Sequence, residues 1–157
     1  MGETRSRPTH VRRDHVRVAR AAASALALSI AFALAGCTPP SEVLEDAVEQ
    51  GIASTATAGI ALELEADGRL LRTTALNAVE DARSQAADAA RTATLVRAGD
   101  EVDAGRQAEA SAALQEAVDA LSGAADALDG IGDPADAATE LAAAEDALRA
   151  LTRQGRP

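Results

Sequence analysis

The chain lacks most of the side chains that carry out enzyme chemistry. It contains no Lys, Trp or Tyr, and both histidines, His10 and His15, lie close to the N-terminus. Beyond residue 36 there is therefore no histidine to serve as the base of a Ser/His/Asp or Cys/His arrangement. Zinc sites and di-iron sites of the Glu-x-x-His type lack their nitrogen ligands for the same reason. We expect no metal and no other cofactor.

Aromatic residues are almost absent as well, since Phe32 is the only one. A pair of carboxylates acting as in a glycosidase needs a cleft that grips a sugar, and such clefts usually offer aromatic side chains. No glycine-rich phosphate loop follows a strand, because no segment has the pattern of a convincing strand. These absences predict a protein that is not an enzyme.

Large apolar side chains are scarce too. Residues 37–157 hold 22 Leu, Ile and Val in 121 positions, about 18%, which together with a high net charge is typical of disordered chains. The same residues include 33 alanines, and alanine is the best helix former although it buries little apolar surface. The composition predicts helices that contact one another closely through alanine.

Basic residues are few beyond residue 36, and all of them are arginine. Residues 37–157 carry nine arginines against 23 acidic residues, a net charge of −14, whereas the whole chain carries −10. Such an acidic body gains nothing from nucleic acid phosphates and is repelled by anionic lipid head groups. We therefore expect no nucleic acid partner.

The N-terminal segment has the opposite character. Six arginines precede an apolar run over 21–35: Arg5, Arg7, Arg12, Arg13, Arg17 and Arg20. A basic region, a short apolar region and a small-residue exit form the secretory pattern, and about 15 residues fall short of the roughly 20 that span a bilayer. Because the arginines come first, the rest of the chain is expected on the outer side of the membrane.

The apolar run ends in Leu34-Ala35-Gly36-Cys37, which contains the single cysteine. This sequence resembles the lipobox of bacterial lipoproteins. The resemblance covers four residues and implies cleavage after Gly36, with a diacylglyceryl group on the sulfur of Cys37. It divides the chain into a signal peptide (1–36), a lipidated cysteine with a proline spacer (37–40) and an acidic, alanine-rich helical domain (41–157). Two acyl chains hold a protein stably on a membrane, so we expect a lipid anchor on the extracytoplasmic face.

Alternatives to this interpretation stay open. An uncleaved membrane anchor would leave Cys37 without a role. Arg12-Arg13 resembles a twin-arginine export signal, although the residues that follow depart from that pattern. The use of Arg in place of Lys, with abundant Ala, Gly and Asp, resembles proteins of high-GC actinobacteria.

The acidic domain is expected to be all-α. Its apolar residues recur at spacings of three and four, which indicates four helices. The first covers about 41–66 and the second runs from Thr73 or Thr74 to about 96. The third ends at about 129, and the fourth runs from 134 to about 153. The expected inward positions are Leu44, Val48, Gly51, Thr55, Gly59, Leu62 and Ala66; Ala75, Val79, Ala82, Ala86, Ala89, Ala93 and Val96; Ala110, Leu114, Ala117, Leu121, Ala124 and Leu128; and Ala137, Leu141, Ala144, Leu148 and Leu151. Four such helices with short loops predict an antiparallel bundle.

Capping residues and turn signals mark the expected helix ends. Ser41 and Thr73 or Thr74 are predicted to cap helix starts, and Asp133-Pro134 is a strong start signal. Asp67-Gly68 and the Gly130–Gly132 segment predict turns, and Gly99 is predicted to follow a helix end. Gly51 and Gly59 mark either a close helix approach or a break. A short strand over 52–57 and a paired-helix repeat remain the alternatives to the bundle.

Two groups of charged residues in this domain are candidates for ligand binding. Asp126, Asp129, Asp133 and Asp136 lie close together in sequence, but their spacing does not match a calcium-binding EF-hand loop, so a solvated, capped helix junction is favoured. Arg69 and Arg72 flank a turn, where pairing with Glu63 and Glu65 is favoured over an anionic ligand.

A lipid anchor and helices without catalytic groups together predict a non-enzymatic envelope lipoprotein that acts as an interaction module or scaffold for an envelope protein. Two alternatives are kept. A helical bundle with few bulky core residues can open a pocket for an apolar ligand or lipid. A chain so poor in large apolar residues can also remain a disordered acidic spacer.

Overall fold

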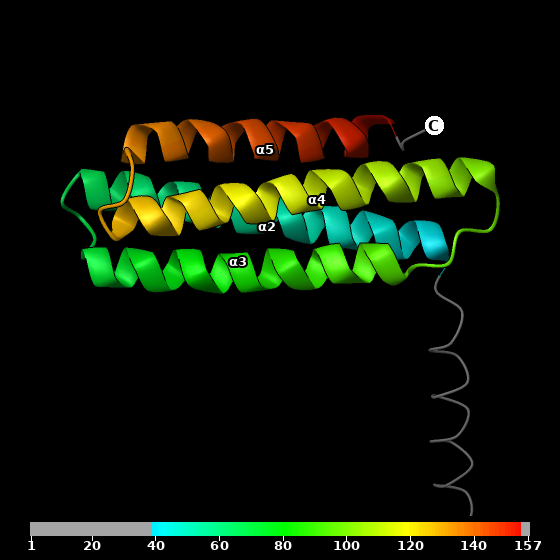
Figure 1. Ribbon diagram of the computed structural model, residues 1–157, viewed down its shortest axis with the longest axis horizontal. Helices are drawn as coiled ribbons and strands as arrows, with labels where there is room; N and C mark the ends of the chain where they lie inside the picture. Colours follow the sequence, from blue (N-terminus) through cyan, green and yellow to red (C-terminus); the bar gives the residue numbers. More distant parts are fainter. Residues whose placement is uncertain (1–38, 155–157) are drawn as a thin grey trace, which may run out of the picture. The chain divides into compact units, whose positions relative to one another are not determined.

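Residues 39–154 form four α-helices in the computed structural model, and these are the residues that the structure describes. The helices are α2 (Pro40–Ala66), α3 (Arg72–Leu95), α4 (Glu101–Leu128) and α5 (Pro134–Gln154), and this part of the chain contains no strand (Figure 1). The predicted all-α bundle is confirmed. The alternative strand over 52–57 is wrong, because those residues lie inside α2.

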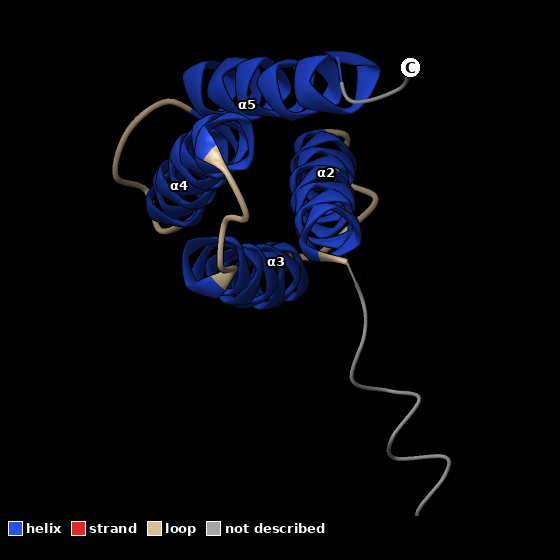
Figure 2. Ribbon diagram, turned by 90° about the vertical axis from the view of Figure 1, so that its right-hand side faces the viewer, coloured by secondary structure: helices blue, strands red, loops and turns tan. Residues whose placement is uncertain are grey.

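The four helices run alternately up and down around a square (Figure 2). Each helix packs on the next one along the chain, α5 packs back on α2, and α2 also reaches α4 across the diagonal. The start of α2, the α3–α4 loop and the end of α5 therefore share one end of the bundle, which we call the entry end (Figure 1). The α2–α3 and α4–α5 loops share the opposite end, the far end.

Each helix buries a narrow stripe of residues that follow one another at sequence spacings of four and three. Nearly all the predicted inward positions are buried, the exceptions being Gly59, Val96 and Leu151, which are half-buried, and Ala66, which is exposed. A mean repeat of 3.5 residues keeps such a stripe on one side of a helix that winds gently around its neighbours. The spacing of the apolar residues thus defines both the helices and their packing.

Alanine dominates the interior. Seventeen of the 26 buried hydrophobic residues are alanine, seven are leucine and two are valine. The buried leucines come from α2, α4 and α5, whereas α3 contributes Val79 and five alanines. Small side chains let helix axes come close together, so the core is made of leucines set against alanine and glycine surfaces.

Gly51 is the position in α2 where the approach of its neighbours is tightest. A Cβ atom built there would lie 2.5 Å from Cδ2 of Leu114 in α4 and 3.1 Å from Cδ1 of Leu148 in α5. Both leucines are fully buried, so they have little room to move. A Cβ atom at Gly59 would meet nothing within 4 Å. Gly51 therefore marks a close approach of three helices, and neither glycine breaks α2.

The helix starts differ in part from the prediction. The N-cap of α2 is Pro39, because Pro40 already has the backbone geometry of a first helical residue, so Ser41 lies inside the helix. The N-cap of α3 is Leu71, which places Thr73 and Thr74 in the first turn. Capping by these hydroxyl residues was therefore a wrong prediction.

Aspartates cap the other two helices. The side chain of Asp100 accepts a hydrogen bond from the backbone N–H of Asp103 at 2.9 Å, at the start of α4. The side chain of Asp133 accepts one from the backbone N–H of Ala135 at 2.8 Å, at the start of α5, as Asp133-Pro134 predicts. Each bond satisfies one of the backbone donors that a helix start leaves free.

The end of α3 is closed by a side chain from the next helix. The amide of Gln107 in α4 donates hydrogen bonds to the carbonyl oxygens of Ala93, Thr94 and Val96, at 3.0, 3.0 and 2.7 Å. Val96 has an extended backbone, so α3 ends without the left-handed residue that Gly99 was predicted to supply. Gln107 pairs carbonyls that a helix end would otherwise leave unpaired.

Glycines with a left-handed backbone conformation follow the ends of α2 and α4, the other two helices that lead into loops. Gly68 has φ +67° after α2, and Gly130 and Gly132 have φ +88° and +104° after α4. The N–H of Gly130 donates to the carbonyl of Ala127, and the N–H of Ile131 donates to that of Asp126. This is the hydrogen-bond pattern of a Schellman motif. The predicted turns at both positions are confirmed.

Replacing the two glycines of α2 tests the close approach at Gly51. Gly59→Ala should raise the free energy of unfolding by about 0.5–1 kcal/mol, because alanine is the better helix former and nothing obstructs it. Gly51→Ala gains the same propensity but overpacks Leu114 and Leu148, which costs about 1–3 kcal/mol. Urea denaturation followed by circular dichroism should therefore show a net loss of about 1 kcal/mol. Equal gains from both substitutions would contradict the packing described here.

The capping role of Gln107 has a matched control on the same helix. Gln107→Ala leaves carbonyls at the end of α3 without their partner and should lower the free energy of unfolding by about 1–2 kcal/mol. Gln115 bonds only to the exposed side chain of Asp119, so Gln115→Ala should change it by less than about 0.5 kcal/mol. Chemical denaturation of both variants measures the difference, and equal effects would argue against the cap.

Candidate functional site

The residues of the predicted lipobox, Leu34, Ala35, Gly36 and Cys37, lie outside the described residues. Their assignment as a cleavage and lipidation site therefore stays a prediction. The described bundle starts at Pro39, two residues after Cys37, and α2 begins at Pro40. Anything attached to Cys37 would accordingly be joined to the entry end by a very short segment.

The acidic residues around the α4–α5 loop act at helix ends. Asp129 is the C-cap of α4, Asp133 caps α5, Asp136 lies in the first turn of α5, and all of these side chains are exposed together with Asp126. Negative side chains stabilise a helix start through the helix dipole. Among residues 39–154 no group of three or more His, Cys, Asp or Glu side chains is arranged to hold a metal ion.

The turn between α2 and α3 holds one of the two predicted ion pairs. The Nε of Arg72 donates to Oε1 of Glu65 across 3.2 Å. Within the described part of the chain, Arg69 and Glu63 form no ion pair. The pairing interpretation therefore holds for Arg72, and this pair joins the end of α2 to the start of α3.

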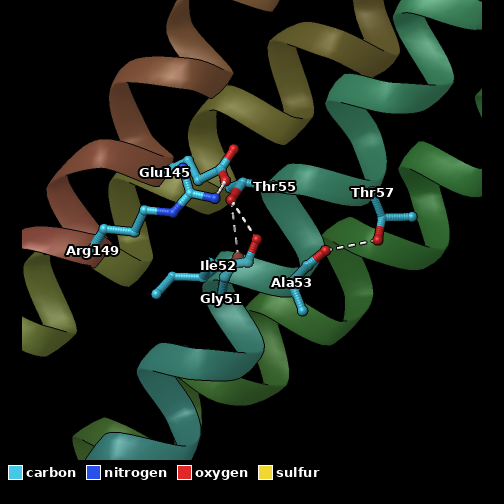
Figure 3. Close-up of polar contacts among 7 residues, drawn as sticks. All are labelled: Gly51, Ile52, Ala53, Thr55, Thr57, Glu145 and Arg149. Carbon is cyan, nitrogen blue, oxygen red and sulfur yellow. Dashed lines mark hydrogen bonds and ion pairs between the residues drawn. The ribbon is translucent and has the colours of Figure 1, made fainter. Parts of the chain in front are cut away.

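Buried polar side chains are few, and all of them are satisfied. Ser54 and Thr55 are the buried polar residues of the described chain, at 2% and 0% exposure. The hydroxyl of Thr55 donates to the carbonyls of Gly51 and Ile52, at 3.1 and 3.0 Å (Figure 3). The hydroxyl of Ser54 donates to the carbonyl of Gln50 at 2.9 Å. Among residues 39–154 no buried side-chain nitrogen or oxygen lacks a partner.

Thr57 repeats this bond on the exposed side of α2, where its hydroxyl donates to the carbonyl of Ala53 at 2.7 Å (Figure 3). Hydroxyls bonded in this way are bound to their own helix. They explain how the β-branched run over 52–57 is accommodated in a helix. They do not form a reactive site.

The ion pair between Glu145 and Arg149 belongs to α5 and is drawn beside this segment in Figure 3. Glu145 precedes Arg149 by four residues, the order that suits the helix dipole. The carboxylate side chain is only 16% exposed, whereas that of Arg149 is 50% exposed. The pair covers the outer edge of the core and leaves little charge free for a ligand.

The entry end contains a groove, which the sequence did not predict. It has a volume of about 310 Å³ and lies between the first turns of α2, the second and third turns of α4 and the last turn of α5. Its apolar lining comes from Leu44, Val48, Ala110 and Leu151, and its charged lining from Glu45, Glu49, Glu109 and Arg106. None of these four charged side chains takes part in an ion pair within residues 39–154. We call this the entry groove.

Five large aliphatic side chains are exposed along the described chain. Leu95 (83%) and Val102 (62%) flank the α3–α4 loop at the entry end, whereas Leu71 (75%) and Ile131 (68%) lie in the loops of the far end, and Ile60 (58%) faces outward from α2. Figure 1 shows the α3–α4 loop at one end of the bundle and the α2–α3 and α4–α5 loops at the other. Both ends thus offer apolar contacts, but from separate loops.

No helix within 39–154 has an apolar stretch long enough to cross a bilayer. In the comparisons with known proteins, no protein-family model, no curated protein and no solved structure matches this chain.

Proposed function

We propose that the protein is a non-enzymatic envelope lipoprotein, held on the extracytoplasmic face of the cell membrane by a diacylglyceryl group on Cys37. It presents the bundle as an interaction module or scaffold for an envelope protein. The observation that supports this most is the position of Cys37, which follows a secretory pattern and directly precedes the bundle. Residues 39–154 contain no His, Lys, Tyr or Cys, side chains that often serve as catalytic bases or nucleophiles.

The dimensions of the bundle support a role in presentation. A 27-residue helix such as α2 is about 40 Å long at 1.5 Å per residue. An anchor at Cys37 would hold the entry end near the lipid, so the far end could reach up to about that distance from it. The far end carries the exposed side chain of Ile131 among exposed aspartates, and the exposed side chain of Leu71 next to Arg72 in the sequence. Apolar side chains within an acidic surface favour a partner that is itself partly apolar and basic.

The alternatives from the sequence fare differently. A largely disordered acidic spacer is not compatible with four packed helices over residues 40–154. Binding of an apolar ligand retains one observation in its favour, the entry groove. That groove does not depend on how the protein is anchored.

Replacing the cysteine tests the anchor. Cys37→Ser removes the sulfur that would carry the diacylglyceryl group, so the variant should leave the membrane fraction or accumulate as a longer, unprocessed precursor. Fractionation followed by immunoblotting and intact mass measurement detects both results. A conservative change two residues later, Pro39→Ala, should leave fractionation and mass of the processed form unaltered. Membrane association and size unchanged by Cys37→Ser would refute lipidation.

Site-specific crosslinking tests the interaction role. A photo-crosslinking amino acid at Leu71 or Ile131 of the full chain in cells should yield a discrete protein adduct, because these side chains lie exposed at the far end. The same amino acid at Ser84, which is exposed in the middle of α3, serves as the control. Adducts from Ser84 alone, or from none of the three positions, would count against a partner at the far end.

A further inference from the structure

We infer that the entry groove binds a small primary alkylammonium or alkylguanidinium compound, with its aliphatic chain inside and its cationic head at the mouth. This binding site goes beyond the interaction module proposed above and is independent of the lipid anchor. Its elements come from three helices that converge at the start of α2, and each feature of its lining restricts the ligand that fits.

The floor of the groove selects an aliphatic chain. Leu44, Val48, Ala110 and Leu151 line it, and each of the three helices contributes at least one of them. No polar group is buried beneath them, since the buried polar residues Ser54 and Thr55 lie further along α2 and are not part of the lining. Burying each methylene of a ligand there strengthens binding by about fourfold, from about 0.8 kcal/mol per CH₂.

The charged lining selects the sign of the head group. Glu45, Glu49 and Glu109 contribute three carboxylates, against the single guanidinium of Arg106. None of these carboxylates is engaged in an ion pair within residues 39–154, so their charge is available to a ligand. The resulting net charge of the lining is negative, which attracts cations and disfavours fatty acids and other anionic amphiphiles.

The absence of aromatic side chains selects the type of cation. Proteins bind quaternary ammonium groups by stacking aromatic rings around them. The chain has one aromatic residue, Phe32, which is outside the described residues. Carboxylates instead favour a head group with N–H donors, because hydrogen bonds to ionised acceptors are the strong ones. A primary ammonium or a guanidinium has these donors, whereas a trimethylammonium has none.

The size of the groove selects a small molecule over a protein segment. About 310 Å³ lies at the lower end of the range for ligand pockets, roughly 300–1,000 Å³. Eleven residues line the groove, whereas about 20–30 residues on each side form a stable protein interface. A short alkyl chain with a compact head group matches these dimensions.

The test uses hexylammonium as the probe and the full chain reconstituted in phosphatidylcholine vesicles, with protein-free vesicles as the blank. Isothermal titration calorimetry should show saturable binding with one site per chain. Hexanoate, with a similar chain and the opposite charge, should bind at least about tenfold more weakly, and so should methylammonium, which lacks the chain. Hexyltrimethylammonium should be weaker than hexylammonium by about threefold or more.

Variants then assign the binding to the groove. The double substitution Glu45→Gln with Glu49→Gln should weaken hexylammonium binding by about fivefold, since exposed ion pairs contribute modestly. The matched double substitution Glu80→Gln with Glu116→Gln removes the same charge from exposed positions outside the groove and should leave the affinity unchanged. All four residues are exposed, so both variants should keep the helical circular dichroism spectrum.

Three results would overturn the inference. The first is an absence of saturable binding, the second is equal affinity for hexanoate, and the third is an equal loss of affinity in the two double variants. Fractionation of Cys37→Ser tests only the anchor, and the titrations test only the groove. Failure of the lipoprotein proposal and failure of the groove proposal are therefore distinguishable.

Discussion

The close approach of helix backbones through small residues is the constraint on which the bundle depends. Leu114 and Leu148 pack directly against the backbone of α2 at Gly51, where a methyl group would collide with them. Elsewhere the buried positions include seventeen alanines, whose side chains are also small. A chain with few large apolar residues can build a core this way, because its leucines pack against surfaces made of small residues. The scarcity of leucine, isoleucine and valine therefore limits stability without preventing a defined fold.

The sequence predicted the helices and their buried faces well, because both follow from one repeat. Spacings of three and four placed Leu121 and Ala124 inside α4, for example, and the structure buries both completely. Helix starts were less predictable, since capping by Ser41 competes with Pro40, whose ring already fixes the first helical turn. The closure of α3 by Gln107 was also missed, because its partners lie 11–14 residues away and only the fold brings them together.

The entry groove shows why the candidate site was harder to predict than the fold. Leu44, Ala110 and Leu151 are about a hundred residues apart at the extremes, and each one alone resembles an ordinary core position. The groove lies where the first turns of α2, the early turns of α4 and the last described turn of α5 come together, so its shape depends on how these helices are offset along the bundle. Such offsets between helix ends depend on loop geometry, which carries no periodic signal in the sequence.

The alanine stripe of α3 has a consequence for how the molecule opens. Apart from Val79, this helix buries only alanines, and half-buried Leu76 is the other large apolar side chain that it packs against the core. Each alanine removes little apolar surface from water, and α3 makes no contact with α5 that would add to its attachment. The attachment of α3 therefore depends on many close contacts of small groups along two neighbouring helices, and the exchange of its amide hydrogens with solvent reports on those contacts.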